Sequence, residues 1–261
     1  MTNEYFGGLD FGSSGARISI IDKSKEIIYE DSCIYSYEFK NTEGWINSCI
    51  KLFEGIPIQI KINLSRLSIS GTSGTLVPCS SNGTPLGNSI PYYEVCTSNP
   101  EKLNLIAGAD KFLNNPYSSL AKAIKLIDTY GDNIILRHQA DWISGWFLND
   151  WSFGEEGNNL KLGWNIANKS WPESFESFSL TQSIPVIKKS GSILGKINQS
   201  IANLLGTSDH LLLISGTTDA NAAFIAAEVK ENEGLTILGT TIVLKKIIKK
   251  TFSHPGITMH R

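Results

Sequence analysis

The sequence predicts an α/β fold, and three observations support this class. Residues 7–21 read as a strand, a glycine-rich turn and a second strand. The continuous apolar run 211–215 leads into a small-residue helix at Asp219, which is the strand-to-helix order of an open α/β sheet. Residues 235–244 repeat the opening pattern of apolar strand, small hydroxyl-rich turn and apolar strand. We interpret the two hairpins as equivalent parts of an internally duplicated structure that clamps phosphates, with coincidence as the alternative.

Composition and charge argue against several classes of function. The 261 residues include 23 Lys and Arg against 25 Asp and Glu, and the formal charge of −2 gives no electrostatic case for nucleic acid or an anionic membrane. The chain has neither a leader-like opening nor a run of about 18 apolar residues, so we expect a cytoplasmic protein. The four cysteines form no CxxC pair and are expected to be reduced and packed.

The first hairpin is a candidate phosphate site. Asp10 stands between two apolar residues at a strand end, where its carboxylate could hold a hydrated Mg²⁺ that bridges phosphate oxygens. Gly12 and Gly15 can adopt positive φ, which would let backbone N–H groups converge on an anion. An ordinary glycine-serine hairpin with a structural aspartate fits these residues equally well.

Strands and helices are then expected in sequence. Strands at 26–29 and 32–37 extend the hairpin, and Asn41 or Thr42 caps a helix that ends near Gly55. The other expected elements are a strand at 58–70, helices at 100–113 and 117–130, a strand at 134–136, an aromatic helix near 142–147, a loop-rich stretch at 150–190, and helices at 192–205 and 220–229. The aromatic helix is predicted to face the core rather than a ligand.

Two further turns are candidate parts of a site. Residues 71–74, Gly-Thr-Ser-Gly, close a predicted strand and could form one wall. Asp219 lies where an apolar strand ends and a helix begins, the position at which an open α/β sheet places its chemistry. The alternative for Asp219 is that it only caps the helix.

These stretches resemble the motifs of the FGGY family of carbohydrate kinases. GLDFGSSGAR resembles the first phosphate motif, SISGTSGTLVPC the following strand-turn-strand, and DWISGWF with NNLKLGWN the substrate-domain signature. GTTDANAAF resembles the catalytic-base motif and LTILGTTIVL the second phosphate motif. The motifs run in family order from residue 7 to residue 244, and the likeness is greatest to ribulokinase-like or xylulokinase-like enzymes of cyanobacteria and plants.

The resemblance implies ATP-dependent phosphorylation of a sugar hydroxyl, with a ketopentose such as D-ribulose or D-xylulose as acceptor. Asp219 would be the general base and Asp10 would organise Mg²⁺. Arg17 would add positive charge near the transferring group, since phosphoryl transfer depends on positioning and charge neutralisation. The residues implied to grip the phosphates are Gly12, Ser13, Ser14, Gly239, Thr240 and Thr241.

The sugar site implied by the resemblance includes Tyr93, Glu94 and Glu155. Tyr93 and Glu94 stand where the family usually has an Asn-Asp pair, and Glu155 stands where Asp is usual. Each change moves a carboxylate by roughly one methylene, and a misplacement on the order of 1 Å can cost about 10²-fold in rate. The expected partners are therefore a small sugar and ATP, and a homodimer is left open.

The implied fold is the actin-like ATPase, or ribonuclease-H-like, fold, with a complete first domain and an incomplete second. Residues 1–228 would form the sugar-binding and catalytic domain, and residues 229–261 would begin a truncated nucleotide-binding domain. We therefore expect little activity from this chain alone. Two alternatives stay open: a non-catalytic remnant that binds a sugar or a partner protein, and an actin-like ATPase without sugar specificity.

Overall fold

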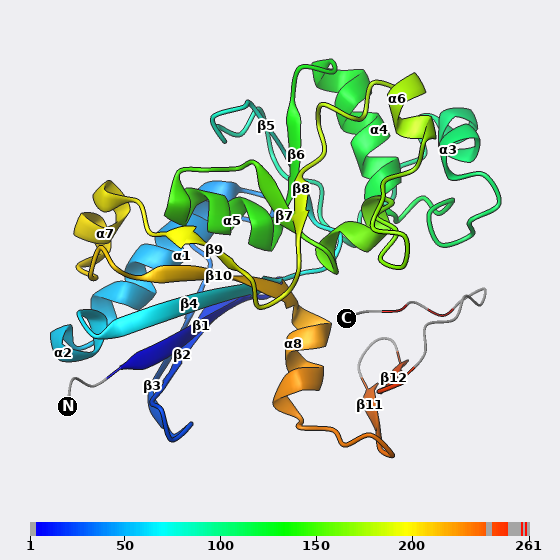
Figure 1. The fold of residues 1–261 in the computed structure, drawn as a ribbon. Coiled ribbons are helices and arrows are strands. Elements are labelled where there is room, and N and C mark those ends of the chain that lie inside the picture. Colours follow the sequence, from blue (N-terminus) through cyan, green and yellow to red (C-terminus); the bar gives the residue numbers. More distant parts are fainter. Residues whose placement is uncertain (1–3, 239–241, 250–256, 258, 260–261) are drawn as a thin grey trace.

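A six-stranded mixed sheet forms the centre of the computed structural model, which describes residues 4–238, 242–249, 257 and 259 (Figure 1). The strand order is β3-β2-β1-β4-β10-β9. β1, β4 and β10 are parallel to one another, whereas β2, β3 and β9 pair antiparallel with their neighbours. The strands are β1 (Tyr5–Phe11), β2 (Gly15–Ile21), β3 (Ile27–Ile34), β4 (Leu64–Gly71), β9 (Ile193–Lys196) and β10 (Leu212–Thr218).

Two helices cover the same face of this sheet. α1 (Thr42–Gly55) packs on β2 and β3, and α5 (Gln139–Leu148) packs on β4 and β10. The rings of Trp45 and Trp142 lie 6.0 Å apart between centroids, as do those of Phe53 and Phe147, so the two helices also contact each other. The prediction that the aromatic helix faces the core is confirmed. α7 (Gln199–Leu205) packs beside α1.

A second layer of structure, at the upper right of Figure 1, has its own apolar core around Leu120, Ile124 and Leu136. β5 pairs antiparallel with β6, and β7 pairs parallel with β8. The elements of this layer are β5 (Leu76–Cys79), α3 (Pro100–Ala107), α4 (Ser119–Tyr130), β6 (Ile135–His138), β7 (Phe153–Glu155), η1 (Asn158–Leu162), α6 (Ser174–Ser177) and β8 (Val186–Lys188).

The end of the described chain leaves the central sheet. α8 (Asp219–Ala226) descends from the end of β10, and β11 (Gly234–Leu238) pairs with β12 (Ile242–Lys246) as a separate hairpin beside it (Figure 1). Lys245 connects the hairpin to α8, because its Nζ donates to Asn221 Oδ1 at 2.5 Å. The predicted second hairpin is confirmed as two strands, but its turn lies outside the described residues.

Two expectations for the first half of the chain are wrong. The two strands expected at 26–29 and 32–37 are one strand, β3, because the polar residues between them pair without interruption with β2. The first residues of the strand expected at 58–70 form the short helix α2 (Ile58–Lys61), which follows Pro57. Ile58 and Ile62 are exposed, so their apolar spacing does not mark a buried strand.

Three predicted helices are also wrong in extent. The helix expected at 192–205 divides into β9, which pairs with β10, and α7, which Asn198 caps by accepting from Ser200 N–H. α3 ends at Ala107 instead of residue 113, because Gly108 takes a positive φ of 56°. α8 ends at Ala226 instead of residue 229. By contrast Asn41 caps α1, which ends at Gly55 as expected.

The predictions on cysteines and membranes can be compared with the described residues. Cys33, Cys49, Cys79 and Cys96 are all free, the last three are buried and Cys33 is half-buried. Within the part of the chain that the structure describes, no helix combines the length and apolar character needed to cross a bilayer.

Gly216 lies at an irregularity in β10 that brings this strand very close to β4. The register of the β10–β4 pair shifts between Ile214 and Thr217. A Cβ built on Gly216 would overlap the carbonyl of Ile69. Only glycine therefore allows β10 to approach β4 at the point where the strand turns toward α8.

Gly216→Ala is expected to lower the free energy of unfolding by about 2 kcal/mol or more, since overpacking commonly costs about 1–3 kcal/mol and a strand backbone yields little. Urea denaturation measures the change. Gly8→Ala is the matched control, because its Cβ would meet only Ser19 O at 4.0 Å. Equal stability of the two variants would contradict the argument.

Candidate functional site

Three polar residues lie side by side near the carboxyl ends of three neighbouring central strands, a place that we call the sheet edge. Asp10 on β1 pairs in register with Ser70 on β4, and Ser70 pairs with Thr217 on β10. Ser70 Oγ donates to Asp10 Oδ1 at 2.8 Å. Because β1, β4 and β10 are parallel, this row lies near the carboxyl ends of all three strands, where open α/β sheets bind ligands.

Asp219 follows this row directly, as the first residue of α8. The cap of α8 is Thr218, whose Oγ1 accepts from Asn221 N–H at 3.4 Å. Asp219 Oδ1 accepts from Ala220 N–H at 2.7 Å. The helix therefore has a cap other than Asp219, and one oxygen of the Asp219 carboxylate carries no hydrogen bond from a described residue.

Burial raises the pKa of Asp219 above its ordinary value, and the negative charge of Asp10 raises it further. The hydrogen bond from Ala220 N–H and the charges of Lys161 and Lys245 act in the opposite direction. The two carboxylates therefore interact electrostatically across the edge of the sheet. A largely buried carboxyl group with a raised pKa, as at Asp219, is a candidate for catalysis.

The glycine-rich turn after β1 is held from one side by Tyr35. Gly12 N–H donates to Gly15 O at 3.0 Å, and the Tyr35 hydroxyl donates to Gly12 O at 2.8 Å. Ser13 and Ser14 are exposed. The expected positive φ at Gly12 and Gly15 is wrong. Gly15 is required for a different reason, because a Cβ there would overlap Cys33 O in β3.

Arg17 lies opposite Asp10 in the β1–β2 pair and is exposed. Directly opposed residues in an antiparallel pair project from the same face of the sheet. The structure thus brings together the predicted residues Asp10, Arg17, Asp219 and the turn after β1. The other predicted phosphate turn, Gly239, Thr240 and Thr241, lies outside the described residues.

The predicted sugar-site residues are divided between two places. Tyr93 is 55% exposed and its ring lies against Phe39, and Glu94 forms an ion pair with Lys125 at 3.2 Å. Glu155 is buried beside η1. Within the described residues no hydrogen bond or ion pair connects these two places, so the structure does not join them directly.

The carboxylate of Glu155 is already hydrogen-bonded within the protein. It accepts from Gly157 N–H at 2.8 Å, from Asn158 N–H at 2.7 Å and from Ser190 Oγ at 2.6 Å. Burial raises the pKa of Glu155, and these three hydrogen bonds lower it. Glu155 therefore holds the start of η1 in place.

Two lysines near Asp219 were not identified from the sequence. Lys161 on η1 donates to Ser73 O in the loop 71–74 at 3.1 Å, which confirms that this loop borders the Asp219 region. Burial lowers the pKa of Lys161 and of Lys245, and the charge of Asp219 raises both. The sequence signal for either lysine is weak. Lys161 is the only charged residue of NNLKLGWN, and Lys245 begins a lysine-rich segment of the kind that commonly ends a strand in solvent.

A buried polar cluster lies between the loop 71–74 and η1. Gln139 Oε1 accepts from Thr72 N–H at 2.9 Å and from Thr72 Oγ1 at 2.7 Å. Asp141 Oδ1 accepts from Glu155 N–H at 2.9 Å, and Asp141 Oδ2 accepts from Asn159 Nδ2 at 3.1 Å. The cluster thus connects the amino end of α5 both to the loop and to η1.

Several atoms of this cluster are unsatisfied. Burial raises the pKa of Asp141 to about 7, with help from the charge of Glu155, and burial lowers the pKa of His138 to about 3. His138 is therefore neutral at neutral pH, whereas Asp141 gains or loses its proton near neutral pH. Four buried atoms of the cluster lack a hydrogen-bond partner within the described chain: His138 Nδ1, Gln139 Nε2, Asn158 Oδ1 and Asn159 Oδ1. Such concentrations of unsatisfied groups are typical of functional sites or of ordered water.

The residues at the sheet edge fit a magnesium-nucleotide. Mg²⁺ commonly uses one or two protein carboxylates and completes its coordination with water and phosphate oxygens, and Asp10 supplies one such carboxylate at the carboxyl end of β1. The described residues contain no cluster of three or more His, Cys, Asp or Glu side chains arranged to hold a metal. The donor set therefore suits a metal that arrives with a phosphate ligand rather than a closed protein cage.

The sheet order, with an antiparallel β1-β2-β3 meander followed by parallel β4 and β10 and carboxylates at one edge, defines an actin-like ATPase fold. The predicted α/β fold class is therefore confirmed. No protein-family model matches the chain.

Solved structures of sugar kinases share this fold. Ligand-bound xylulose kinase from Lactobacillus acidophilus matches with a TM-score of 0.79 and 14% identity, over 93% of this chain and 54% of that chain. Gluconate kinase from the same organism matches with a TM-score of 0.78 and 14% identity, over 94% of this chain and 54% of that chain. Plasmodium falciparum glycerol kinase with ADP matches with a TM-score of 0.73 and 17% identity, over 93% of this chain and 54% of that chain. The chain thus spans about half the length of these structures.

Asp219→Asn is expected to stabilise the protein at neutral pH. The fold raises the pKa of Asp219, so ionisation penalises the native state once the pH exceeds the ordinary value of 3.8, and an amide avoids this penalty. The stability difference from the wild type should be smallest near pH 4 and grow as the pH rises. Thermal unfolding at several pH values measures it, and a variant that is less stable than the wild type at neutral pH would contradict the prediction.

Lys161→Gln is expected to raise the pKa of Asp219, since a nearby positive charge that favours the carboxylate is lost. Carbon NMR of the Asp219 carboxyl group during a pH titration measures the shift. Lys102→Gln is the control, because Lys102 pairs with Asp128 at 2.9 Å instead. A titration of Asp219 unchanged by Lys161→Gln would show that the two charges do not interact.

Proposed function

We propose that this chain is part of an ATP-dependent kinase that phosphorylates a hydroxyl group of a sugar, with a ketopentose such as D-ribulose or D-xylulose as the acceptor. The observation that carries the proposal is the meeting of Asp10, the turn after β1 and Asp219 at one sheet edge. The matched structures support the proposal, because they include kinases of xylulose, gluconate and glycerol. The FGGY-type motifs of the sequence point to the same chemistry.

In this proposal Asp219 is the general base that accepts the proton of the sugar hydroxyl. One of its oxygens is oriented by Ala220 N–H, which leaves the other for the substrate. Lys161 and Lys245 favour the ionised carboxylate, which a base requires, against the effect of burial. A positioned general base typically contributes about 10²- to 10⁴-fold in rate.

The phosphate groups are assigned to the turn after β1 and to the second hairpin. Ser13 and Ser14 offer hydroxyl and backbone donors, and Arg17 adds positive charge on the same face as Asp10. The second hairpin would bind the phosphate groups through Gly239, Thr240 and Thr241. Asp10, oriented by Ser70, would hold Mg²⁺, which supplies charge neutralisation on the phosphates when bound.

The sugar contacts and the domain division belong to the same proposal. Tyr93 and Glu94 are accessible for direct contact, whereas Glu155 would act by fixing η1 and, through it, Lys161. Residues 1–228 form the proposed sugar-binding and catalytic domain, and residues 229–261 the proposed start of a nucleotide-binding domain. Cytoplasmic location remains a prediction from the sequence.

The test is ADP release by the purified chain with ATP, Mg²⁺ and either D-ribulose, D-xylulose, gluconate or glycerol. Turnover by this chain is expected to be low, because the chain spans about half the length of the matched kinases. Whatever ketopentose-dependent turnover it has is expected to fall about 10³-fold in Asp219→Asn, because the base is lost. Asp209→Asn serves as the control, since that carboxylate is exposed. ATP hydrolysis that does not respond to any of the sugars would contradict the proposal and favour an ATPase without sugar specificity.

A second candidate function is non-catalytic binding of a sugar or a partner protein. It is favoured by the apolar side chains that the β11–β12 hairpin exposes, with Leu238 at 76%, Ile242 at 71% and Leu244 at 76%. Apolar strand surfaces of this kind commonly pair with other chains or other parts of a protein. Ketopentose binding by calorimetry without any ADP release would favour this candidate over the kinase.

A further inference from the structure

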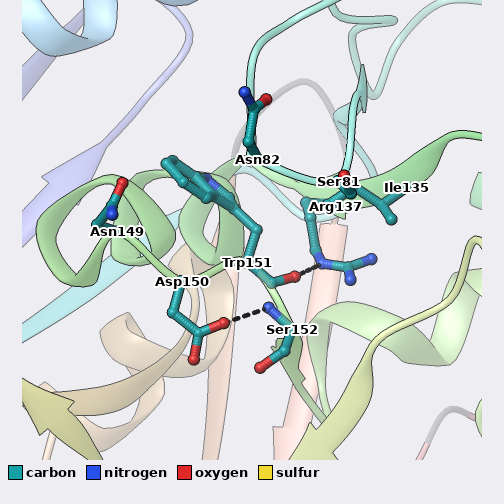
Figure 2. A pocket seen from close by; sticks show the side chains of 8 residues that line it. All are labelled: Ser81, Asn82, Ile135, Arg137, Asn149, Asp150, Trp151 and Ser152. Carbon is teal, nitrogen blue, oxygen red and sulfur yellow. Dashed lines mark hydrogen bonds between the residues drawn. The ribbon is translucent and has the colours of Figure 1, made fainter.

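A small pocket lies beside α5, and residues from both ends of this helix line it. Arg137, two residues before Gln139, precedes the amino end of α5, and Asn149 follows its carboxyl end. The pocket has a volume of about 240 Å³ and is lined by Ser81, Asn82, Ile135, Arg137, Asn149, Asp150, Trp151 and Ser152 (Figure 2).

Arg137 is the most unusual group in this lining, because it is 3% exposed and forms no direct ion pair with a described residue. Its Nε donates to Trp151 O, and its Nη1 donates to Leu136 O at 2.7 Å and to Ser183 O at 3.0 Å. In the described ranges, no carboxylate lies within ion-pair distance of the guanidinium, and Nη2 makes no hydrogen bond.

A buried and unpaired charge is costly for a protein to keep. Burial lowers the pKa of Arg137 to about 10, whereas the charges of Asp141 and Asp150, beyond ion-pair distance, raise it, so the group remains charged at neutral pH. Taking a charge out of water costs several kcal/mol unless an opposite charge or a set of hydrogen bonds compensates it, and three carbonyl groups offset only part of this. The guanidinium is therefore positioned to form an ion pair with an anionic ligand.

The remaining polar groups of the pocket mostly donate hydrogen bonds. Ser81 and Ser152 flank Arg137 in Figure 2, and neither hydroxyl bonds to another described residue. Asn82 uses its Oδ1 to accept from Ser80 Oγ and Thr84 N–H, which leaves its amide nitrogen for a ligand. Asp150 is the one carboxylate in the lining, and its Oδ1 accepts from Ser152 N–H at 2.9 Å.

We propose that this pocket binds a small oxyanion, a phosphate ester or a carboxylate, that also carries a hydroxyl group. The oxyanion lies toward Arg137, Ser81 and Ser152, and the ligand's hydroxyl donates to Asp150. A volume of about 240 Å³ is below the range of about 300–1,000 Å³ typical of drug-sized ligands, so the ligand has few heavy atoms. This proposal does not depend on the proposed kinase function.

Two negative features, the carboxyl end of α5 and the carboxylate of Asp150, oppose anion binding, and the positive charge of Arg137 opposes both. The carboxyl end of α5 carries a partial negative charge of roughly half a unit, against the full positive charge of Arg137. Its carbonyls at Gly145 and Trp146 are already occupied by Asp150 N–H and Asn149 N–H. The second feature is the carboxylate of Asp150, whose Oδ1 accepts from Ser152 N–H at 2.9 Å and whose Oδ2 is the proposed acceptor for the ligand's hydroxyl (Figure 2).

The test is calorimetric titration of the full chain, at constant ionic strength, with inorganic phosphate, glycerol 1-phosphate, lactate and uncharged glycerol. Glycerol 1-phosphate or lactate is expected to bind and glycerol is not. Binding of the phosphate ester alone identifies a phosphate site, binding of lactate alone identifies a carboxylate site, and either result supports the proposal.

Asn82→Asp places a negative charge in the pocket and keeps the oxygen that accepts from Ser80 and Thr84. It is expected to weaken binding about 10-fold or more, because like charges meet in a partly desolvated space. Asn88→Asp adds the same charge in the same loop outside the pocket and should change the affinity by no more than about 2-fold. Equal effects of the two variants, or no anion binding by the wild type, would overturn the proposal.

Discussion

The parallel pairing of β1, β4 and β10 is the constraint on which the candidate site depends. Parallel strands end at the same edge, so Asp10, Ser70 and Thr217 meet there although they are far apart in the chain. Gly216 allows β10 to approach β4 closely enough for this register. The start of α8 then carries Asp219 to the same edge. Each polar group of the site thus takes its position from main-chain hydrogen bonds, which are rigid.

Charge balance is the second organising feature of the site. Asp10 and Asp219 repel each other at a partly buried edge, and Lys161 and Lys245 reduce that repulsion. The two lysines come from η1 and from β12, which are far apart in the sequence and belong to different layers. A carboxylate that burial makes more basic and that nearby lysines keep ionised suits a general base. Because ionisation of Asp219 in the fold is costly, we expect stability and the proposed function to be opposed at this residue.

Much of the secondary structure could be predicted because local signals were strong. The β1–β2 hairpin, the cap of α1 at Asn41 and the helix start at Asp219 all follow from short-range chemistry. The errors occurred where local pattern and tertiary pairing disagree. Residues 193–196 have helical spacing of apolar side chains, but pairing with β10 makes them a strand. Ile58 and Ile62 alternate as in a strand, yet they are exposed on a helical turn.

The chain's own chemistry determined the α/β fold class, the candidate site residue Asp219 and the phosphate-type turn after Asp10, since these depend on residue types and spacings within a few positions, whereas the role of Asp219 as a base rests on the resemblance of its motif to a known family. Only the tertiary structure decided which distant groups join them. It placed Lys161 and Lys245 near Asp219, engaged Glu155 in holding η1, and left Arg137 buried without a direct ion pair beside a pocket. The physical reason is that charge interactions and burial depend on distances in space, and residues far apart along the chain come together only when the strands pair.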